Sequence, residues 1–271
     1  MLLPHAGCCW CAAVLSKGYS TATKVDISTK SDLNDGTSIT TSFVRDAADK
    51  ISAVLKASTS FKGVQFDATA TGAGTIKAKA SMADVVDGVS LSVDTSLDGG
   101  AKVADLATPT ITAEYQQGDV SAEVSVTGST LDASATYSAG DLCVGASSSY
   151  DSSAGSLGDP SLAASYVMGA STFTASLNGL SGDDLTATVA HTVSDDLKVA
   201  GTFSSKDQKF SMGAGYSLDS TSSIKAKVNS DGVVSVGYAR KLTPKASLTA
   251  GFQVDTNDMD SRKFGVALSV A

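Results

Sequence analysis

The chain has 271 residues, enough for one or two domains, and only 18% of them are charged, with 28 acidic against 20 basic side chains and a formal net charge of −8. This acidic balance argues against nucleic acid as a partner, because binding to a phosphate backbone requires a basic patch. Small residues dominate, which argues against the dense interior of a soluble sandwich, and no apolar run reaches the roughly eighteen residues of a membrane-spanning helix.

The first predicted element is a short helix within residues 1–19. Leu2 to Leu15 is mostly apolar, and Pro4 suits a first helical turn. A secretory or lipoprotein signal is the alternative interpretation of this stretch. It is disfavoured because no basic residue precedes the apolar run. We therefore treat residues 1–19 as an N-terminal helical segment and linker.

From Lys24 to Val270 the chain alternates between apolar and polar residues, so residues 20–271 form one β domain. In Lys245–Asp255, for example, Leu248 belongs to an apolar side and Thr249 to a polar side. Turn residues separate about nineteen strand-length segments. The predicted segments start at Lys24, Thr37, Lys50, Lys62, Thr75, Gly88, Pro109, Val120, Leu131, Leu142, Ser161, Thr172, Asp184, Leu197, Gln208, Thr221, Val233, Lys245 and Arg262.

Short connections between these segments predict antiparallel neighbours and a closed barrel. They are too short for crossover helices, so consecutive strands should pair antiparallel. So many strands in an open sheet would expose its edges, and closure removes them. The sequence therefore predicts an all-β transmembrane barrel of about nineteen strands. An extracellular β-repeat is the alternative, but no fixed repeat length is found.

The cysteines and histidines give no metal or catalytic constellation. Cys8, Cys9 and Cys11 form one N-terminal cluster, whereas zinc sites usually draw ligands from two. Cys143 lies alone on the polar side of a strand, as a buried or lumen-facing thiol would. No nucleophile elbow, phosphate loop or paired His/carboxylate motif appears. We expect no enzyme activity, no metal and no cofactor.

Several segments match the motifs of one family of membrane barrels. Near the start, Val14–Tyr19 leads into Lys24–Lys30 as at that family's junction between helix and first strand. Asp183–Ala187 and the hairpin after it also fit. The C-terminal signature is carried by Ser223–Gly232, Val236–Tyr238, Leu242–Thr249, Val254–Thr256 and Lys263–Leu268. In these motifs the chain resembles the voltage-dependent anion channels, which are the eukaryotic porins of the mitochondrial outer membrane.

The resemblance implies a nineteen-stranded barrel with an N-terminal helix in or near the pore, and parallel pairing of the first and last strands. It implies a voltage-gated pore of the mitochondrial outer membrane, with several membrane passes and weak anion selectivity. The implied partners are membrane lipid, inorganic anions and metabolite anions such as adenine nucleotides. Whether the chain forms a homo-oligomer is left open. Alternatives are a general porin, a protein-import barrel, or a structural β protein outside membranes. The segment before Val14 departs from the family, because it lacks the charges of the amphipathic helix.

In a water-filled barrel the apolar side faces lipid and the polar side lines the pore. This rule predicts inward-facing lysines mainly on the first and last strands, and inward-facing acids mainly in the middle third. We infer a pore with one basic and one acidic wall, and weak anion preference. The set of predicted pore-lining lysines includes one residue of the junction before the first strand, Lys17. Its members are Lys17, Lys24, Lys77, Lys79, Lys198, Lys225, Lys227 and Lys263. The inward acids are Asp67, Asp94, Glu114, Glu123 and Asp132.

Overall fold

A computed structural model describes residues 14–15, 19, 24–32, 37–45, 51–72, 74–98 and 107–270; for 24–32, 44–45 and 51 it describes the backbone alone. The strands are β1 (Lys24–Asp32), β2 (Ser38–Arg45), β3 (Ile51–Phe61), β4 (Val64–Thr71), β5 (Ile76–Val86), β6 (Val89–Leu97), β7 (Thr110–Gln117), β8 (Val120–Thr127), β9 (Thr130–Ala139), β10 (Leu142–Asp151), β11 (Ser156–Leu157), β12 (Ser161–Met168), β13 (Ser171–Asn178), β14 (Asp184–Thr192), β15 (Leu197–Ser204), β16 (Lys209–Ser217), β17 (Ser222–Asn229), β18 (Val233–Thr243), β19 (Ala246–Asp255) and β20 (Asp258–Val270).

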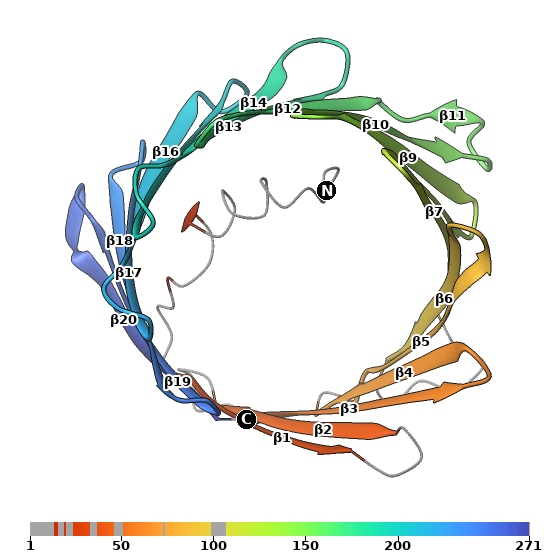
Figure 1. The fold of residues 1–271 in the computed structure, drawn as a ribbon, viewed down its shortest axis with the longest axis horizontal. Coiled ribbons are helices and arrows are strands. Elements are labelled where there is room, and N and C mark those ends of the chain that lie inside the picture. The colour runs from red at the N-terminus through yellow and green to blue at the C-terminus, as the bar shows by residue number, and fades with distance from the viewer. Residues whose placement is uncertain are drawn as a thin grey trace.

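These strands form one closed ring (Figure 1). The two-residue strand β11 extends the connection between β10 and β12, which pair directly, so nineteen full strands make the wall of the described chain. Consecutive full strands pair antiparallel, which confirms the predicted fold class and strand number.

The structure corrects the predicted start of the last strand, which is Asp258 and not Arg262. The chain turns immediately after Asp255, and Asp258 pairs back onto that residue across a register irregularity. The residues of β20 before Phe264 are polar except for Met259, so they show no alternation that sequence reasoning could detect. The other predicted starts agree with the structure to within two residues.

Parallel pairing of the first and last strands closes the ring. Lys24 lies opposite Ala267, and Ile27 lies opposite Val270. An odd number of full strands in an up-and-down ring brings the first and last strands together in the same direction, as the family resemblance implies. Both strands therefore run toward the same mouth of the ring, named here the C-terminal mouth, and the first residues of β1 pair with the last residues of β20.

The wall is a single layer with little buried interior. Its outer face carries large apolar side chains that remain exposed, such as Phe264 at 63% and Met212 at 58%. The buried apolar residues are few and mostly small. Among the described residues no helix has the length and apolar character needed to cross a membrane.

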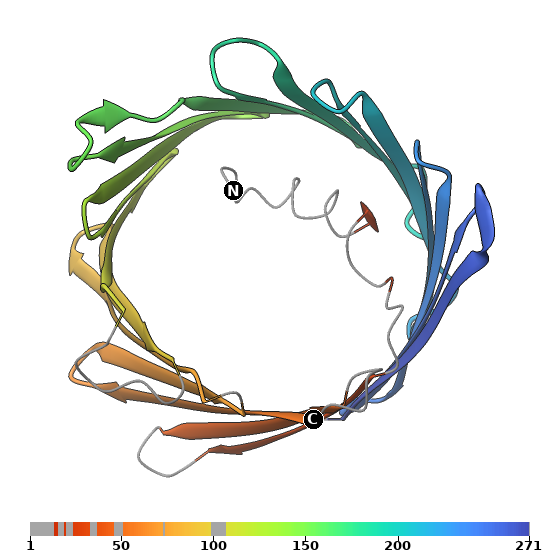
Figure 2. The same ribbon diagram turned by 180° about the vertical axis from the view of Figure 1, so that it is seen from behind.

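The short helical piece at Val14–Leu15 lies inside the ring, beside the wall near β16 (Figures 1 and 2). The rest of the predicted helical segment 1–19, apart from Tyr19, lies outside the described residues. The division into a segment 1–19 and a barrel 20–271 stays a prediction.

Candidate pore lining

The position of Val14–Leu15 inside the ring identifies the inner face of the neighbouring strands. The Lys227 Nζ donates a hydrogen bond of 2.9 Å to the Leu15 carbonyl oxygen, so Lys227 on β17 points into the lumen. Side chains alternate along a strand, so Lys225 shares this face, while Ile224 and Val228 lie on the outer face and are 37% and 40% exposed. The pairing registers extend this assignment from strand to strand, so the inner and outer faces of the other full strands follow from that of β17.

Lysines gather on the inner face between β15 and β20. Lys198 lies opposite Gly215, which in turn lies opposite Lys225. Lys263 lies opposite Gln253 and shares the inner face. With Lys227, these side chains form what we call the basic arc, defined as Lys198, Lys225, Lys227 and Lys263.

The two remaining described lysines of the predicted set sit among acids. On β5, Lys79 lies directly between Asp67 of β4 and Asp94 of β6, and Lys77 lies next to it on the same face. These four side chains line a lumen-facing hollow of about 540 Å³. Sheet register therefore brings two of the predicted inward acids, Asp67 and Asp94, beside the predicted inward Lys79, so the basic charge of β5 is largely balanced locally.

Acids occupy the inner face of β7–β9, and their cross-strand partners among the described residues include no Lys or Arg. Glu114 and Glu123 lie directly opposite each other, and Asp132 follows on β9. Between Lys102 and Lys198 the sequence contains no Lys or Arg. We call Glu114, Glu123 and Asp132 the acidic arc; Figure 1 shows β7 and β9 across the ring from β17 and β18.

Small residues on the inner wall form a seat for Val14 and Leu15, which sequence reasoning missed. Val14 is 2% exposed and packs with Ala190 of β14 and Ala200 of β15. A Cβ at Gly213 would lie 3.0 Å from the Leu15 Cδ2. Glycine on the polar side of a strand is a weak signal of such a close approach.

Tyr19 completes the contact with the wall. Its hydroxyl donates a 2.6 Å hydrogen bond to the Val14 carbonyl oxygen, and the Lys227 Nζ lies 4.6 Å from the centre of its ring. Burial raises the pKa of Tyr19 to about 12, so its hydroxyl stays a neutral donor at physiological pH.

Two of the predicted pore-lining lysines are not placed by the structure. Lys17 lies outside the described residues, and only the backbone of Lys24 is described.

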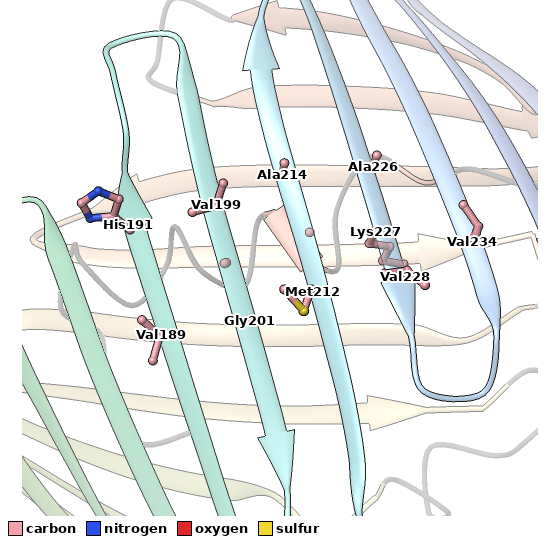
Figure 3. Close-up of a pocket in the computed structure, with 12 residues that line it drawn as sticks. Val189, His191, Val199, Gly201, Met212, Ala214, Ala226, Lys227, Val228 and Val234 are labelled. Atoms are coloured by element: carbon pink, nitrogen blue, oxygen red, sulfur yellow. The ribbon is translucent and has the colours of Figure 1, made fainter.

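A shallow groove of about 580 Å³ lies over β14–β18, and its lining side chains belong mainly to the outer apolar set (Figure 3). The groove exists because the residues Gly201, Ala214 and Ala226 are small, and the Met212 side chain lies beside them. His191 stands at one side, where its Nδ1 is 2.8 Å from the Ser171 hydroxyl.

The described cysteine and the metal-ligating residue types form no reactive cluster. Cys143 is a buried free thiol, as expected from its place on the polar side of β10. Across the described ranges, no three His, Cys, Asp or Glu side chains gather as they would around a metal ion.

A closed ring with large apolar side chains outside and Lys, Glu, Asp, Ser and Thr inside is a membrane β-barrel of the porin type. Solved structures of bacterial porins share this fold. A mutant of Rh. blastica porin matches with a TM-score of 0.54 at 11% identity, covering 82% of this chain and 90% of that chain. A second mutant of the same porin matches with a TM-score of 0.52.

The chain belongs to the eukaryotic porin family, whose sequence model matches residues 10–265. It is 35% identical over 95 residues to the non-selective voltage-gated ion channel VDAC2 of Meleagris gallopavo, covering 33% of this chain and 32% of that protein. It is 30% identical over 158 residues to the mitochondrial outer membrane protein porin 1 of Oryza sativa, covering 56% of this chain and 57% of that protein. The matches thus span about a third to over half of these relatives. Porins are channels, which confirms the prediction that the chain is not an enzyme.

Proposed function

We propose that this chain is a voltage-gated pore of the mitochondrial outer membrane that passes small ions and metabolites, including adenine nucleotides. The observation that carries the proposal is the closed ring of nineteen full strands with a polar inner face and Val14–Leu15 seated inside it. The names of the similar proteins from Meleagris gallopavo and Oryza sativa support the location and the voltage gating.

Recording from the purified protein in a planar bilayer tests this function. We expect stepwise conductance that falls when the voltage is raised with either sign. Liposomes that contain the protein should also release trapped ATP, whereas protein-free liposomes should retain it. A protein that inserts but conducts at no voltage would contradict the proposal.

The two arcs support weak anion selectivity. Anions are favoured along the basic arc and cations along the acidic arc, and the β5 lysines contribute little because Asp67 and Asp94 flank Lys79. Acids in the turns, such as Asp119 and Asp141, meet bulk water and are screened within about 8 Å at physiological salt. The net charge of −8 therefore overstates the acidity of the pore.

Charge reversal on the inner face tests the selectivity. The triple variant Lys198→Glu, Lys225→Glu, Lys263→Glu should move the reversal potential in a salt gradient toward cations. The double variant Glu114→Gln, Glu123→Gln should move it toward anions. The matched control, with Asp119→Lys and Asp141→Lys in the turns, should move it far less. Equal shifts from the turn and wall variants would contradict the two-arc pore.

A further inference from the structure

The lumen-facing hollow over β4–β6, which we call the β5 hollow, places its polar side chains in two adjacent rows. In the first row, Lys77 lies opposite Thr69 of β4 and Ser96 of β6, so an ammonium stands between two hydroxyls. In the second row, two residues further along β5 and on the same face, Lys79 lies between the two carboxylates described above. The hollow therefore offers hydrogen-bond donors in one row and both donors and acceptors in the next.

Three charged groups of the β5 hollow are open to a ligand. Among the residues that the structure describes, the ammonium groups of Lys77 and Lys79 and the carboxylate of Asp94 have no hydrogen-bond or ion-pair partner. Asp67 differs, because its two carboxylate oxygens lie 3.1 and 3.3 Å from the Nε2 of Gln65. Lys79 thus stands between two acids without an ion pair to either, and Asp94 is the acceptor that remains open.

The chain that leads into β7 borders one side of the hollow. The Ala107 N–H donates to the Ser96 carbonyl oxygen at 2.8 Å, and the Thr95 hydroxyl donates to the Ala107 carbonyl oxygen at 2.8 Å. These bonds hold the chain against β6, and Thr108 and Thr110 line the hollow next to them. A volume of about 540 Å³ is therefore bounded by charged groups on the sheet and by hydroxyl-bearing residues at its side.

This set of groups matches a phosphate monoester that also carries hydroxyls. Two ammonium groups favour a phosphate, because charge-assisted hydrogen bonds are stronger than neutral ones. An ionised carboxylate only accepts hydrogen bonds, so Asp94 binds hydroxyl groups and repels a phosphate. A simple anion would use the lysines and leave Asp94 as a repelling charge beside it. A ligand with a phosphate at one end and hydroxyls at the other uses both rows.

We propose that the β5 hollow is a binding site for sugar phosphates inside the pore, where Lys77 and Lys79 bind the phosphate and Asp94 accepts hydrogen bonds from the sugar hydroxyls. The inference rests on the proposed function, because it names a class of metabolite that the pore holds during passage. The local balance of charge at β5, which limits its effect on simple anions, is what lets this site distinguish a sugar phosphate from them.

Equilibrium binding to the full-length protein in detergent tests the proposal with three probes, ribose 5-phosphate, methyl phosphate and ribose. Titration calorimetry should show tighter binding of ribose 5-phosphate than of methyl phosphate, which has the same charged group without the sugar hydroxyls. Ribose alone should bind more weakly than either. Equal dissociation constants for the two phosphates would overturn the proposal, since the hollow would then only attract anions.

The variant Asp94→Ala should change the binding of the two phosphates in opposite directions. Loss of the negative charge should tighten the binding of methyl phosphate, whereas loss of the acceptor should weaken the binding of ribose 5-phosphate. Because these groups are exposed to water, each dissociation constant should change about two- to fivefold. Lys77→Met should weaken the binding of both. Tighter binding of both phosphates to Asp94→Ala would show that this carboxylate only repels, and would overturn the proposal.

Asp132→Ala is the matched control, because it removes an inward carboxylate of the acidic arc and should leave both dissociation constants nearly unchanged. Circular dichroism shows whether each variant forms its barrel, and the comparison of the three probes on the wild type needs no variant. If the wild type conducts but binds ribose 5-phosphate no better than methyl phosphate, the inference fails and the proposed function stands. If the probes bind as expected but the protein conducts at no voltage, the proposed function fails and the binding site stands.

Discussion

At the scale of single residues, the outer and inner faces of the wall impose opposite requirements on neighbouring positions. Val124 lies on the outer face near the middle of β8, between Ala113 and Ala133 on the adjacent strands, and is 40% exposed. Ser125 is the next residue and lies on the inner face, opposite Asp132. One step along the chain therefore separates hydrocarbon from water.

Arginine substitution at these two positions measures that difference. Val124→Arg should lower the free energy of unfolding by about 2–4 kcal/mol, because it places a charge near the bilayer midplane. Ser125→Arg should cost much less, since its charge meets water and Asp132. Urea titration of refolded protein in lipid vesicles measures both values. Similar losses at the two positions would refute the assignment of faces.

The sequence predicts which side chains point into the pore, but it does not predict which inward side chains of neighbouring strands lie beside one another. Alternation is a local property, so it assigned Lys225 and Lys227 inward without knowledge of the other strands. Which side chains stand beside Lys79 depends on the register of β4 and β6, and register is set by pairing between strands. The seat at Gly213 depends on a segment about two hundred positions earlier in the sequence and carries no charge or motif that marks it.

At the scale of elements, the turns are ordered by side chains that bond to the backbone. Asp219, between β16 and β17, accepts hydrogen bonds from the backbone N–H and the hydroxyl of both Thr221 and Ser222, at 2.6 to 2.9 Å. These bonds favour the carboxylate and lower the pKa of Asp219 to about 2, with the Thr221 hydroxyl contributing most. The start of β17 is thus tied to an ionised side chain.

This tie predicts a pH dependence of stability in acid. Because the pKa of Asp219 is lower in the folded state, its contribution is full above the ordinary value of 3.8 and is lost as the pH falls toward about 2. The difference in urea midpoint between wild type and Asp219→Ala should be constant from pH 7 to about pH 5 and shrink below it. A difference that grows on acidification would show that the carboxylate is not the stabilising form.

At the scale of the whole molecule, the parallel seam between β1 and β20 is the feature that defines the ring. It has four paired positions, from Lys24 with Ala267 to Ile27 with Val270. The neighbouring antiparallel pair β19–β20 runs along nearly the full length of both strands. The short seam is the place where the wall has the fewest ladder bonds to hold it.

Engineered cysteines test the direction and register of this seam. In a background with the four native cysteines replaced by serine, Val25→Cys and Leu268→Cys should form a disulfide on oxidation, because these positions face each other. Val25→Cys with Val266→Cys is the control, offset by two residues, and should cross-link far more slowly. Preferential cross-linking of the offset pair would show a different closure.

The odd number of full strands also decides that the first and last strands end toward the same aqueous compartment. Strands β1 and β20 run in the same direction, so both end toward the C-terminal mouth, and the first residues of β1 pair with the last residues of β20. A ring with an even number of strands would return its last strand to the compartment where its first began. Here the last strand ends toward the same compartment as the first strand, so a membrane-impermeant reagent added on that side should label cysteines placed at the ends of both strands and report the orientation of the inserted barrel.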